Sequence, residues 1–328
     1  MRPALFWLTF ALAVFVPPLL AQEARVPLVA VLETDPPEES IVPVLRESLH
    51  DLHYVEGRNI RFEVRTSISQ NERLPDLVKE IVALKPAVIV SKNSATTLAL
   101  RDRAGTIPVV MVVTFDPISL GVIQSLAHPG GTFTGLSTSG REHFGKRIEL
   151  LKEFFPRLRR LFLLWTPIDS ASPEPRSRRN AFEAVQSAAA PAGIEVVSIQ
   201  IRGSDELRNA LTMSVNNTTD ALLVLRSGII VDSYHQIAEF AMQHHIPAMS
   251  NDPLFVAEGG LFGYSPDYTA HVRRAAVYVD KILKGENPAD LPVEQPNTFR
   301  LVANLTTARA LGSEIPLSIL VQVDEVIE

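Results

Sequence analysis

A unit of buried strand, helix and buried strand occurs twice in this chain, in segments far apart in the sequence. The first copy covers residues 85–116 and the second covers residues 219–252. In both copies an Ile-Pro pair opens the second strand, and an Asp-Pro pair follows it at Asp116 and Asp252. The strands of the first copy do not alternate between apolar and polar residues, which predicts parallel strands covered by helices on both faces. Two copies of one unit predict two similar lobes with a cleft between them.

The rest of the chain extends this unit into two complete lobes. Strands expected at residues 26–32, 60–65, 87–90 and 107–113 alternate with helices, the last of which is expected at residues 117–127. We assign residues 26–138 plus 266–292 to the N-terminal lobe and residues 139–265 plus 293–328 to the C-terminal lobe. The predicted fold class is α/β, with two doubly wound parallel-sheet lobes joined by a three-segment hinge near residues 138, 265 and 294.

The composition narrows the classes of function. With 328 residues, 46% hydrophobic and 21% charged, the chain resembles an ordinary globular protein of about two domains. The formal net charge of −6, without a recurrent basic cluster, makes nucleic acid and anionic membrane surfaces unexpected partners. The chain has no cysteine, which excludes disulfides, thiolate metal sites and cysteine nucleophiles.

The N-terminus has the pattern of a secretory signal peptide. Arg2 precedes an apolar run over residues 4–20, and Ala21 is followed by polar residues. We therefore assign residues 1–21 to a signal peptide that is cleaved after Ala21, which predicts a periplasmic mature protein that is not inserted in the membrane. The alternative is an uncleaved membrane anchor, against which the pair Pro17-Pro18 argues.

No motif in the sequence predicts catalysis. Residues 140–147 resemble a phosphate-binding loop, but Arg147 replaces the required Ser or Thr, and a helix is expected from residue 144. His50 and His53 lie three residues apart on a helix without a third ligand nearby, so solvated histidines are expected rather than a metal site. We expect no cofactor, no metal and no enzymatic activity.

The candidate binding residues lie in loops at the carboxyl ends of the strands, where doubly wound sheets bind ligands. Helix N-termini in these loops favour a carboxylate, and Asp35, Asp116 and Asp252 would accept hydrogen bonds from an ammonium group. Each of these three aspartates precedes a proline, so helix capping is the alternative role. The aromatic residues would pack on an apolar or aromatic group, or belong to the core or the hinge. The predicted ligand-binding residues are Thr34, Asp35, Asn93, Ser94, Thr96, Thr114, Phe115, Asp116, Arg226, Asn251, Asp252 and Tyr264.

Several stretches, taken together and in order, resemble the substrate-binding proteins of bacterial ABC transporters, in the group that includes tryptophan-binding members. They include His128-Pro-Gly-Gly-Thr-Phe-Thr-Gly-Leu-Ser, Lys146-Arg-Ile-Glu-Leu-Leu, Gly259-Gly-Leu-Phe-Gly-Tyr and the segment 282–296. The resemblance implies a type I periplasmic-binding-protein fold that closes over a small molecule and delivers it to a permease with its ATPase. The ligand contacts that it implies are Asp35, Asn93–Thr96, Thr114–Asp116, Arg226 and Asn251–Asp252. The chain departs from many relatives at residues 91–94, where Lys92 stands in place of a small Gly/Thr-rich sequence.

The sequence thus predicts a monomeric, extracytoplasmic solute-binding protein of an ABC importer, whose ligand is an amino acid or a related carboxylate. One alternative is an extracytoplasmic sensor, in which the same closure signals to a receptor. Another is an enzyme on the same fold, which would need acid, base or nucleophile residues that converge in the cleft.

Overall fold

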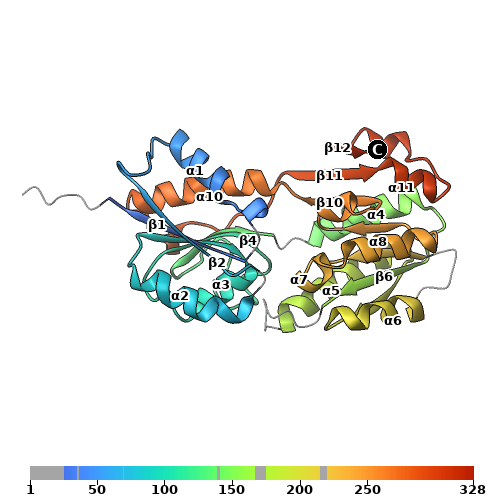
Figure 1. The fold of residues 1–328 in the computed structure, drawn as a ribbon, viewed down its shortest axis with the longest axis horizontal. Coiled ribbons are helices and arrows are strands. Elements are labelled where there is room, and N and C mark those ends of the chain that lie inside the picture. The colour runs from blue at the N-terminus through green and yellow to red at the C-terminus, as the bar shows by residue number, and fades with distance from the viewer. Residues whose placement is uncertain (1–25, 35–36, 69, 139–140, 167–174, 215–219) are drawn as a thin grey trace, which may run out of the picture.

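The chain folds into two lobes that lie end to end (Figure 1). The computed structural model describes residues 26–34, 37–68, 70–138, 141–166, 175–214 and 220–328. The predicted signal peptide and Asp35 lie outside the described residues. None of the described helices is both long enough and apolar enough to span a membrane.

The first lobe is built on a five-stranded parallel sheet in the order β2-β1-β3-β4-β5. Alternate residues of β1 pack into two different cores, Val29 and Val31 into one and Ala30 and Leu32 into the other. This two-sided burial explains why the strands are apolar without alternation. The strands are β1 (Leu28–Glu33), β2 (Arg61–Thr66), β3 (Val88–Asn93), β4 (Val109–Thr114) and β5 (Phe133–Ser137). Helices α1 (Val42–Asp51) and α10 (Tyr268–Leu283) supply one core, and α2 (Leu74–Ala83) and α3 (Ser94–Arg101) supply the other.

The second lobe repeats this topology and extends it. Its sheet has the order β7-β6-β8-β9-β10-β11-β12, so its first five strands repeat the order of the first sheet. The strands are β6 (Arg160–Trp165), β7 (Glu195–Gln200), β8 (Asp220–Val224), β9 (Ala248–Ser250), β10 (Phe262–Pro266), β11 (Phe299–Asn304) and β12 (Glu325–Ile327). The helices are α4 (Arg141–Phe154), α5 (Pro175–Ala189), α6 (Ser204–Ser214), α7 (Gly228–Val231), α8 (Tyr234–Gln243), α9 (Leu254–Ala257), α11 (Leu305–Ala310) and α12 (Leu317–Leu320). The predicted repeat and the two-lobe α/β fold are therefore confirmed.

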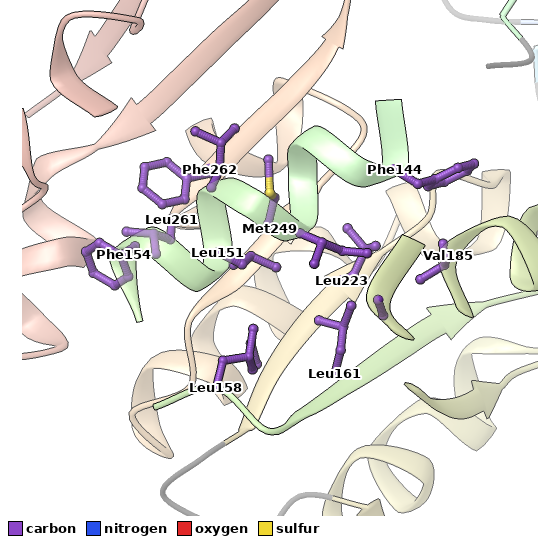
Figure 2. Packing of buried hydrophobic residues seen from close by; sticks show 14 of the residues in the cluster. Phe144, Leu151, Phe154, Leu158, Leu161, Val185, Leu223, Met249, Leu261 and Phe262 are labelled. Atoms are coloured by element: carbon purple, nitrogen blue, oxygen red, sulfur yellow. The ribbon is translucent and has the colours of Figure 1, made fainter. Parts of the chain in front are cut away.

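The core of the second lobe forms between α4 and the sheet. Figure 2 shows Leu151 and Phe154 of α4 close to Met249 and Phe262 of the strands. The rings of Phe154 and Phe262 meet edge to face, with centroids 5.5 Å apart. Edge-to-face contact is a favoured arrangement of buried aromatic rings, and it fixes α4 on the strands that lead to the first lobe.

Three details differ from the expectation. Residues 117–127 form turns instead of a helix, because Asp116 (φ 47°) and Gly121 (φ 70°) both adopt left-handed backbone conformations that end helical propagation. The second sheet is not wholly parallel, since β11 runs antiparallel to β10. The last residues of the chain, for which no strand was predicted, add β12 beside β11.

Three connections join the lobes. The first runs from β5 to α4, the second from β10 to α10 through Asp267, and the third from α10 back to β11. The third connection stays with the first lobe as far as Glu294, which bridges to Leu136, and Val293 packs in a first-lobe core. All three connections therefore reach the second lobe close to β10 and β11.

Candidate functional site

Each sheet has one topological switch point, at which the strand order reverses. In the first lobe it lies between β1 and β3, and in the second it lies between β6 and β8. Ligands of doubly wound sheets bind outside the carboxyl ends of strands at such points. A side-chain hydrogen bond spans each switch point: Asn93 Nδ2 donates to Thr34 Oγ1 at 2.7 Å, and the hydroxyls of Thr166 and Ser227 lie 2.8 Å apart. Both lobes therefore present a polar edge at the position where this fold binds solutes.

Asn93 and Thr96 begin helix α3 at the first of these edges. Asn93 Oδ1 accepts hydrogen bonds from the backbone N–H groups of Ala95 and Thr96, at 3.1 and 3.2 Å. Thr96 Oγ1 accepts from the Asn93 N–H at 3.1 Å, which completes a capping box. The sequence signal at these two positions thus has a local structural cause, and their contact with a ligand remains a prediction.

Ser94, Thr114 and Phe115 hold the next loop of the same edge. Ser94 Oγ accepts from the backbone N–H of Phe115 at 2.9 Å, and the buried hydroxyls of Thr97 and Thr114 lie 2.8 Å apart. Phe115 belongs to the first lobe but packs against the main core of the second lobe. Phe115 is therefore an apolar contact between the lobes.

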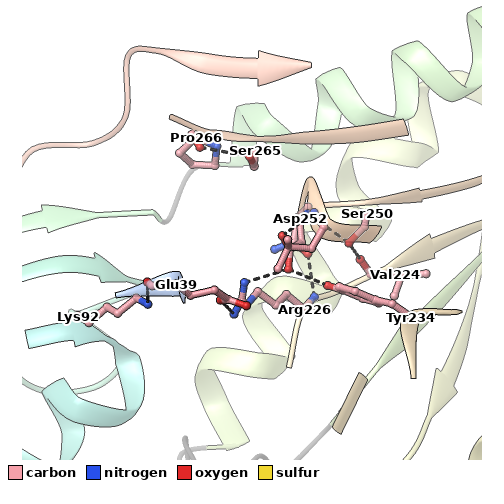
Figure 3. Close-up of polar contacts among 11 residues, drawn as sticks. Glu39, Lys92, Val224, Arg226, Tyr234, Ser250, Asp252, Ser265 and Pro266 are labelled. Carbon is pink, nitrogen blue, oxygen red and sulfur yellow. Dashed lines mark hydrogen bonds and ion pairs between the residues drawn. The ribbon is translucent and has the colours of Figure 1, made fainter. Parts of the chain in front are cut away.

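The partly buried Arg226 and the buried Asp252 form a charge cluster at the edge of the second lobe (Figure 3). Arg226 Nη1 donates to Asp252 Oδ2 at 2.9 Å, and its backbone N–H donates to Asn251 Oδ1 at 2.8 Å. The hydroxyl of Tyr234 also donates to Asp252 Oδ2, at 3.1 Å. Burial, followed by the nearby Asp252 carboxylate, raises the pKa of Tyr234 well above its ordinary value, so this hydroxyl stays protonated and donates. The predicted residues Arg226, Asn251 and Asp252 thus lie together.

Polar contacts of Arg226 and Asn180 link the second lobe to the first across the junction. Arg226 Nη2 donates to Glu39 Oε2 at 3.0 Å, and Glu39 belongs to a 3₁₀ turn, η1 (Pro37–Glu39), of the first lobe. Asn180 of α5 donates to Asp116 Oδ2 at 2.7 Å. Lys92 donates to the backbone carbonyl of Glu39, which fixes η1 over the edge of the first sheet (Figure 3). Asp116 and Arg226, both predicted site residues, therefore bind the opposite lobe in this structure.

Tyr264 lies in β10, where the second connection leaves the second lobe. Its ring stacks on Phe299 with centroids 5.2 Å apart and an interplanar angle of 17°. Its backbone carbonyl accepts a hydrogen bond from Arg147 Nε at 2.9 Å. Within the protein, Tyr264 therefore packs on Phe299, the first residue of β11, and its contact with a ligand remains a prediction.

Sequence reasoning missed four residues of this junction: Glu39, Arg147, Asn180 and Tyr268. Burial, together with the Asp252 carboxylate, raises the pKa of Tyr268 to about 12, although the positive charges of Arg226 and Arg147 oppose the rise. Tyr268 therefore lies within electrostatic reach of both arginines. Its sequence signal was its place at the start of a long helix, directly after a connection. The signal for Arg147 was its place in the rejected phosphate-loop motif.

Other regions of the described chain offer weaker sites. No group of three or more His, Asp or Glu residues in the described ranges has the arrangement of a metal site. A surface cavity of about 350 Å³ lies beside Leu28 and Arg61, the first residues of β1 and β2. That cavity is at the amino ends of the strands, opposite to the edge at which this fold binds solutes.

Comparison with known proteins agrees with this geometry. A family model described as ABC transporter substrate binding protein matches residues 26–327. A tyrosine-binding protein of Clostridioides difficile is 24% identical over 268 residues, which is 82% of this chain and 75% of that protein.

Among solved structures, a conserved domain protein of Vibrio cholerae has a TM-score of 0.81 and 24% identity, and the match covers 92% of this chain and all of that one. An ABC domain of Streptococcus pneumoniae in complex with L-Trp has a TM-score of 0.79 and 21% identity, and the match covers 92% of this chain and 99% of that one.

Proposed function

Because the chain belongs to the ABC transporter substrate-binding protein family, we propose that it is an extracytoplasmic binding protein of an ABC importer, with an aromatic amino acid as its solute. One observation carries the proposal: the carboxyl-end loops of both lobes meet, with Glu39 bound to Arg226 and Asn180 bound to Asp116. A solute in this position contacts both lobes at once. Its binding energy therefore favours the closed arrangement over an open one.

The amino-acid class is supported by chemistry and by relatives. The junction contains aromatic side chains, among them Phe115, Tyr264 and Tyr268, together with carboxylates, a guanidinium and helix N-termini. An aromatic amino acid combines a ring with a carboxylate and an ammonium group, and these groups match that set. The related proteins described above are a tyrosine-binding protein and a domain in complex with L-Trp.

The remaining parts of the proposal follow from the family. We propose that the mature protein lies in the periplasm after removal of residues 1–21, and that an ABC permease with its ATPase recognises the closed form. The protein binds its solute without a cofactor and without chemical conversion. Its action is therefore a change in the balance between open and closed arrangements.

Isothermal titration calorimetry of the purified mature protein tests the proposal. The panel contains L-tyrosine, L-tryptophan, L-phenylalanine, branched amino acids and neutral sugars. We expect an aromatic amino acid to bind with the highest affinity and to raise the melting temperature. Tighter binding of a neutral sugar than of any amino acid would contradict the proposed function, as would turnover of the bound compound.

A further inference from the structure

Arg147 is a buried arginine for which the described part of the chain supplies no acidic partner. It lies in the second turn of α4 and is only 4% exposed. Its Nε donates to the Tyr264 carbonyl, and its guanidinium lies over the rings of Phe144 and Tyr264 at 5.2 and 5.9 Å from the ring centroids. Among the described residues, none forms a hydrogen bond or an ion pair with its two terminal nitrogens.

Other arginines of the chain show how unusual this is. Arg160 has a side chain that is 31% exposed, yet it donates two hydrogen bonds to the buried Asp220, at 3.0 and 2.7 Å. Arg226 pairs with both Asp252 and Glu39. A buried charge without a counter-charge is unfavourable, so proteins normally pair it. Arg147 is more deeply buried than Arg160 and Arg226, yet it lacks the acidic partner that each of them has among the described residues.

The surroundings of Arg147 are aromatic and neutral. Burial lowers the pKa of Arg147 to about 10, so the guanidinium is still charged at neutral pH. Burial, together with the positive charge of Arg147 and the neighbouring His271, also lowers the pKa of His143 to about 4, so His143 is neutral there. The Nε2 atoms of His143 and His271 are buried and have no hydrogen-bond partner among the described residues. The group thus has one fixed positive charge and unused hydrogen-bonding atoms.

This group lies where the three connections between the lobes meet. Arg147 follows the first connection, Tyr264 precedes the second, and Phe299 follows the third and contacts His143 with ring centroids 4.2 Å apart. His271, on α10, comes from the first lobe and faces the carbonyl of Val112 at 3.2 Å. Tyr268 lies within electrostatic reach of both Arg147 and the Arg226–Asp252 pair. The unpaired charge is therefore part of the same junction as the candidate site.

We propose that Arg147 binds the carboxylate of the captured solute through its two terminal nitrogens. The geometry of a guanidinium matches a carboxylate in two parallel hydrogen bonds. The carboxylate of the solute then provides the negative counter-charge that no described acidic residue provides. The proposal rests on the proposed function and identifies the residue that selects for a carboxylate. The competing role is structural, with Arg147 acting only through its contacts with Phe144 and the Tyr264 carbonyl.

The test compares carboxylates with their decarboxylated analogues by calorimetry. Each of L-tyrosine, tyramine, L-tryptophan and tryptamine is titrated into the wild type and into the variants Arg147→Gln, Arg147→Lys and Arg157→Gln. Arg157 is the matched control, since it is an exposed arginine that lies over the ring of Phe155 at 6.0 Å. Thermal melting of each variant without ligand reports whether it is folded.

We expect the wild type to bind the amino acid roughly 100-fold more tightly than its amine, because the amine leaves Arg147 unpaired. Arg147→Gln should weaken binding of the amino acid by a similar factor and leave binding of the amine within a few-fold, so that the preference disappears. Arg147→Lys should retain part of the preference, and Arg157→Gln should retain all of it.

Two results would overturn the inference, in distinguishable ways. If the wild type binds aromatic amino acids and the folded Arg147→Gln variant keeps the full preference for the carboxylate, Arg147 has only a structural role and the proposed function stands. If variants at Arg147 weaken the binding of the amino acid and of the amine by the same factor, Arg147 likewise has only a structural role. If the wild type binds no amino acid in the panel, the proposed function and the inference both fail.

Discussion

Two arginines, Arg226 and Arg147, lie where the lobes meet, and they differ in whether acidic residues neutralise their charge. Arg226 is satisfied by acids from both lobes, Asp252 beside it and Glu39 opposite. Arg147 is more deeply buried and has aromatic rings and one carbonyl as its neighbours. A compensated charge stabilises the contact between the lobes without a solute, whereas an uncompensated charge is stabilised only by a solute that brings a carboxylate. Under the two proposals above, the difference separates residues that close the junction from a residue that selects its occupant.

The largest effect is expected at the compensated arginine. Asp252→Ala should lower the free energy of unfolding by about 3 kcal/mol, because it leaves the Arg226 guanidinium and the Tyr234 hydroxyl without their buried acceptor. Urea denaturation followed by tryptophan fluorescence measures it. The control Asp232→Ala, at an exposed position, should change the value by less than about 0.5 kcal/mol. Equal effects of the two variants would show that the cluster does not stabilise the lobe.

The second prediction concerns pH and the neighbourhood of Arg147. The folded pKa of His143 is about 4, whereas a histidine in an unfolded chain titrates near its ordinary 6.5. Between these values the unfolded state binds the proton and the folded state does not, so the free energy of unfolding falls as the pH drops from 6.5 to 4. His143→Asn should reduce this fall by up to about 2 kcal/mol, since His143 is half-buried. Melting curves at several pH values measure it, and parallel profiles for both proteins would contradict it.

A smaller effect is expected at the ion pair that links the lobes. Glu39→Gln should favour the open arrangement by about 0.5–1 kcal/mol, because the Glu39 and Arg226 side chains are only partly buried, at 26% and 30% exposed. Small-angle X-ray scattering of the unliganded protein should show a larger radius of gyration than the wild type, most clearly at low salt. Glu286→Gln is the control, since Glu286 pairs with Lys281 on the surface of the first lobe. An unchanged radius for Glu39→Gln would exclude a role of this pair in closure.

The smallest effect completes the comparison of the two arginines. Arg147→Gln without ligand should change the free energy of unfolding by less than about 1 kcal/mol, because no buried acid loses its partner and an unpaired buried charge is removed. Urea denaturation measures it beside Asp252→Ala. A loss as large as that of Asp252→Ala would mean that Arg147 is as important for the fold as the compensated pair.

The fold was largely predictable from local sequence. The strands of both lobes were found because residues such as Val29, Ala30, Val31 and Leu32 are all buried, on alternating sides of one sheet. The helix expected after Asp116 was wrong, because the left-handed backbone of Asp116 depends on a turn that propensity does not report. The last strand was missed because Glu325–Ile327 is short and pairs only at the edge of the sheet.

The candidate site was predictable only in part. Loops at strand ends were found from topology, since residues such as Asn93 and Arg226 follow apolar runs. The bonds from Arg226 to η1 and from Asp116 to α5 depend on how the lobes meet, which no local pattern encodes. Arg147 is a charged residue in an otherwise ordinary helix, and its burial results from three connections that are distant in the sequence. Sequence reasoning therefore located the edges of the junction but not its unpaired charge.

Hydrogen exchange with mass spectrometry tests the central claim, capture of a solute between two lobes, most directly. The protein is compared with and without the aromatic amino acid that binds most tightly in calorimetry. The account predicts slower exchange on both sides of the junction, in residues 91–96 and 114–119 of the first lobe and in residues 225–234 and 250–256 of the second. Exchange at the amino end of β2, near Arg61, should not change. Protection confined to one lobe, or centred on Arg61, would contradict it.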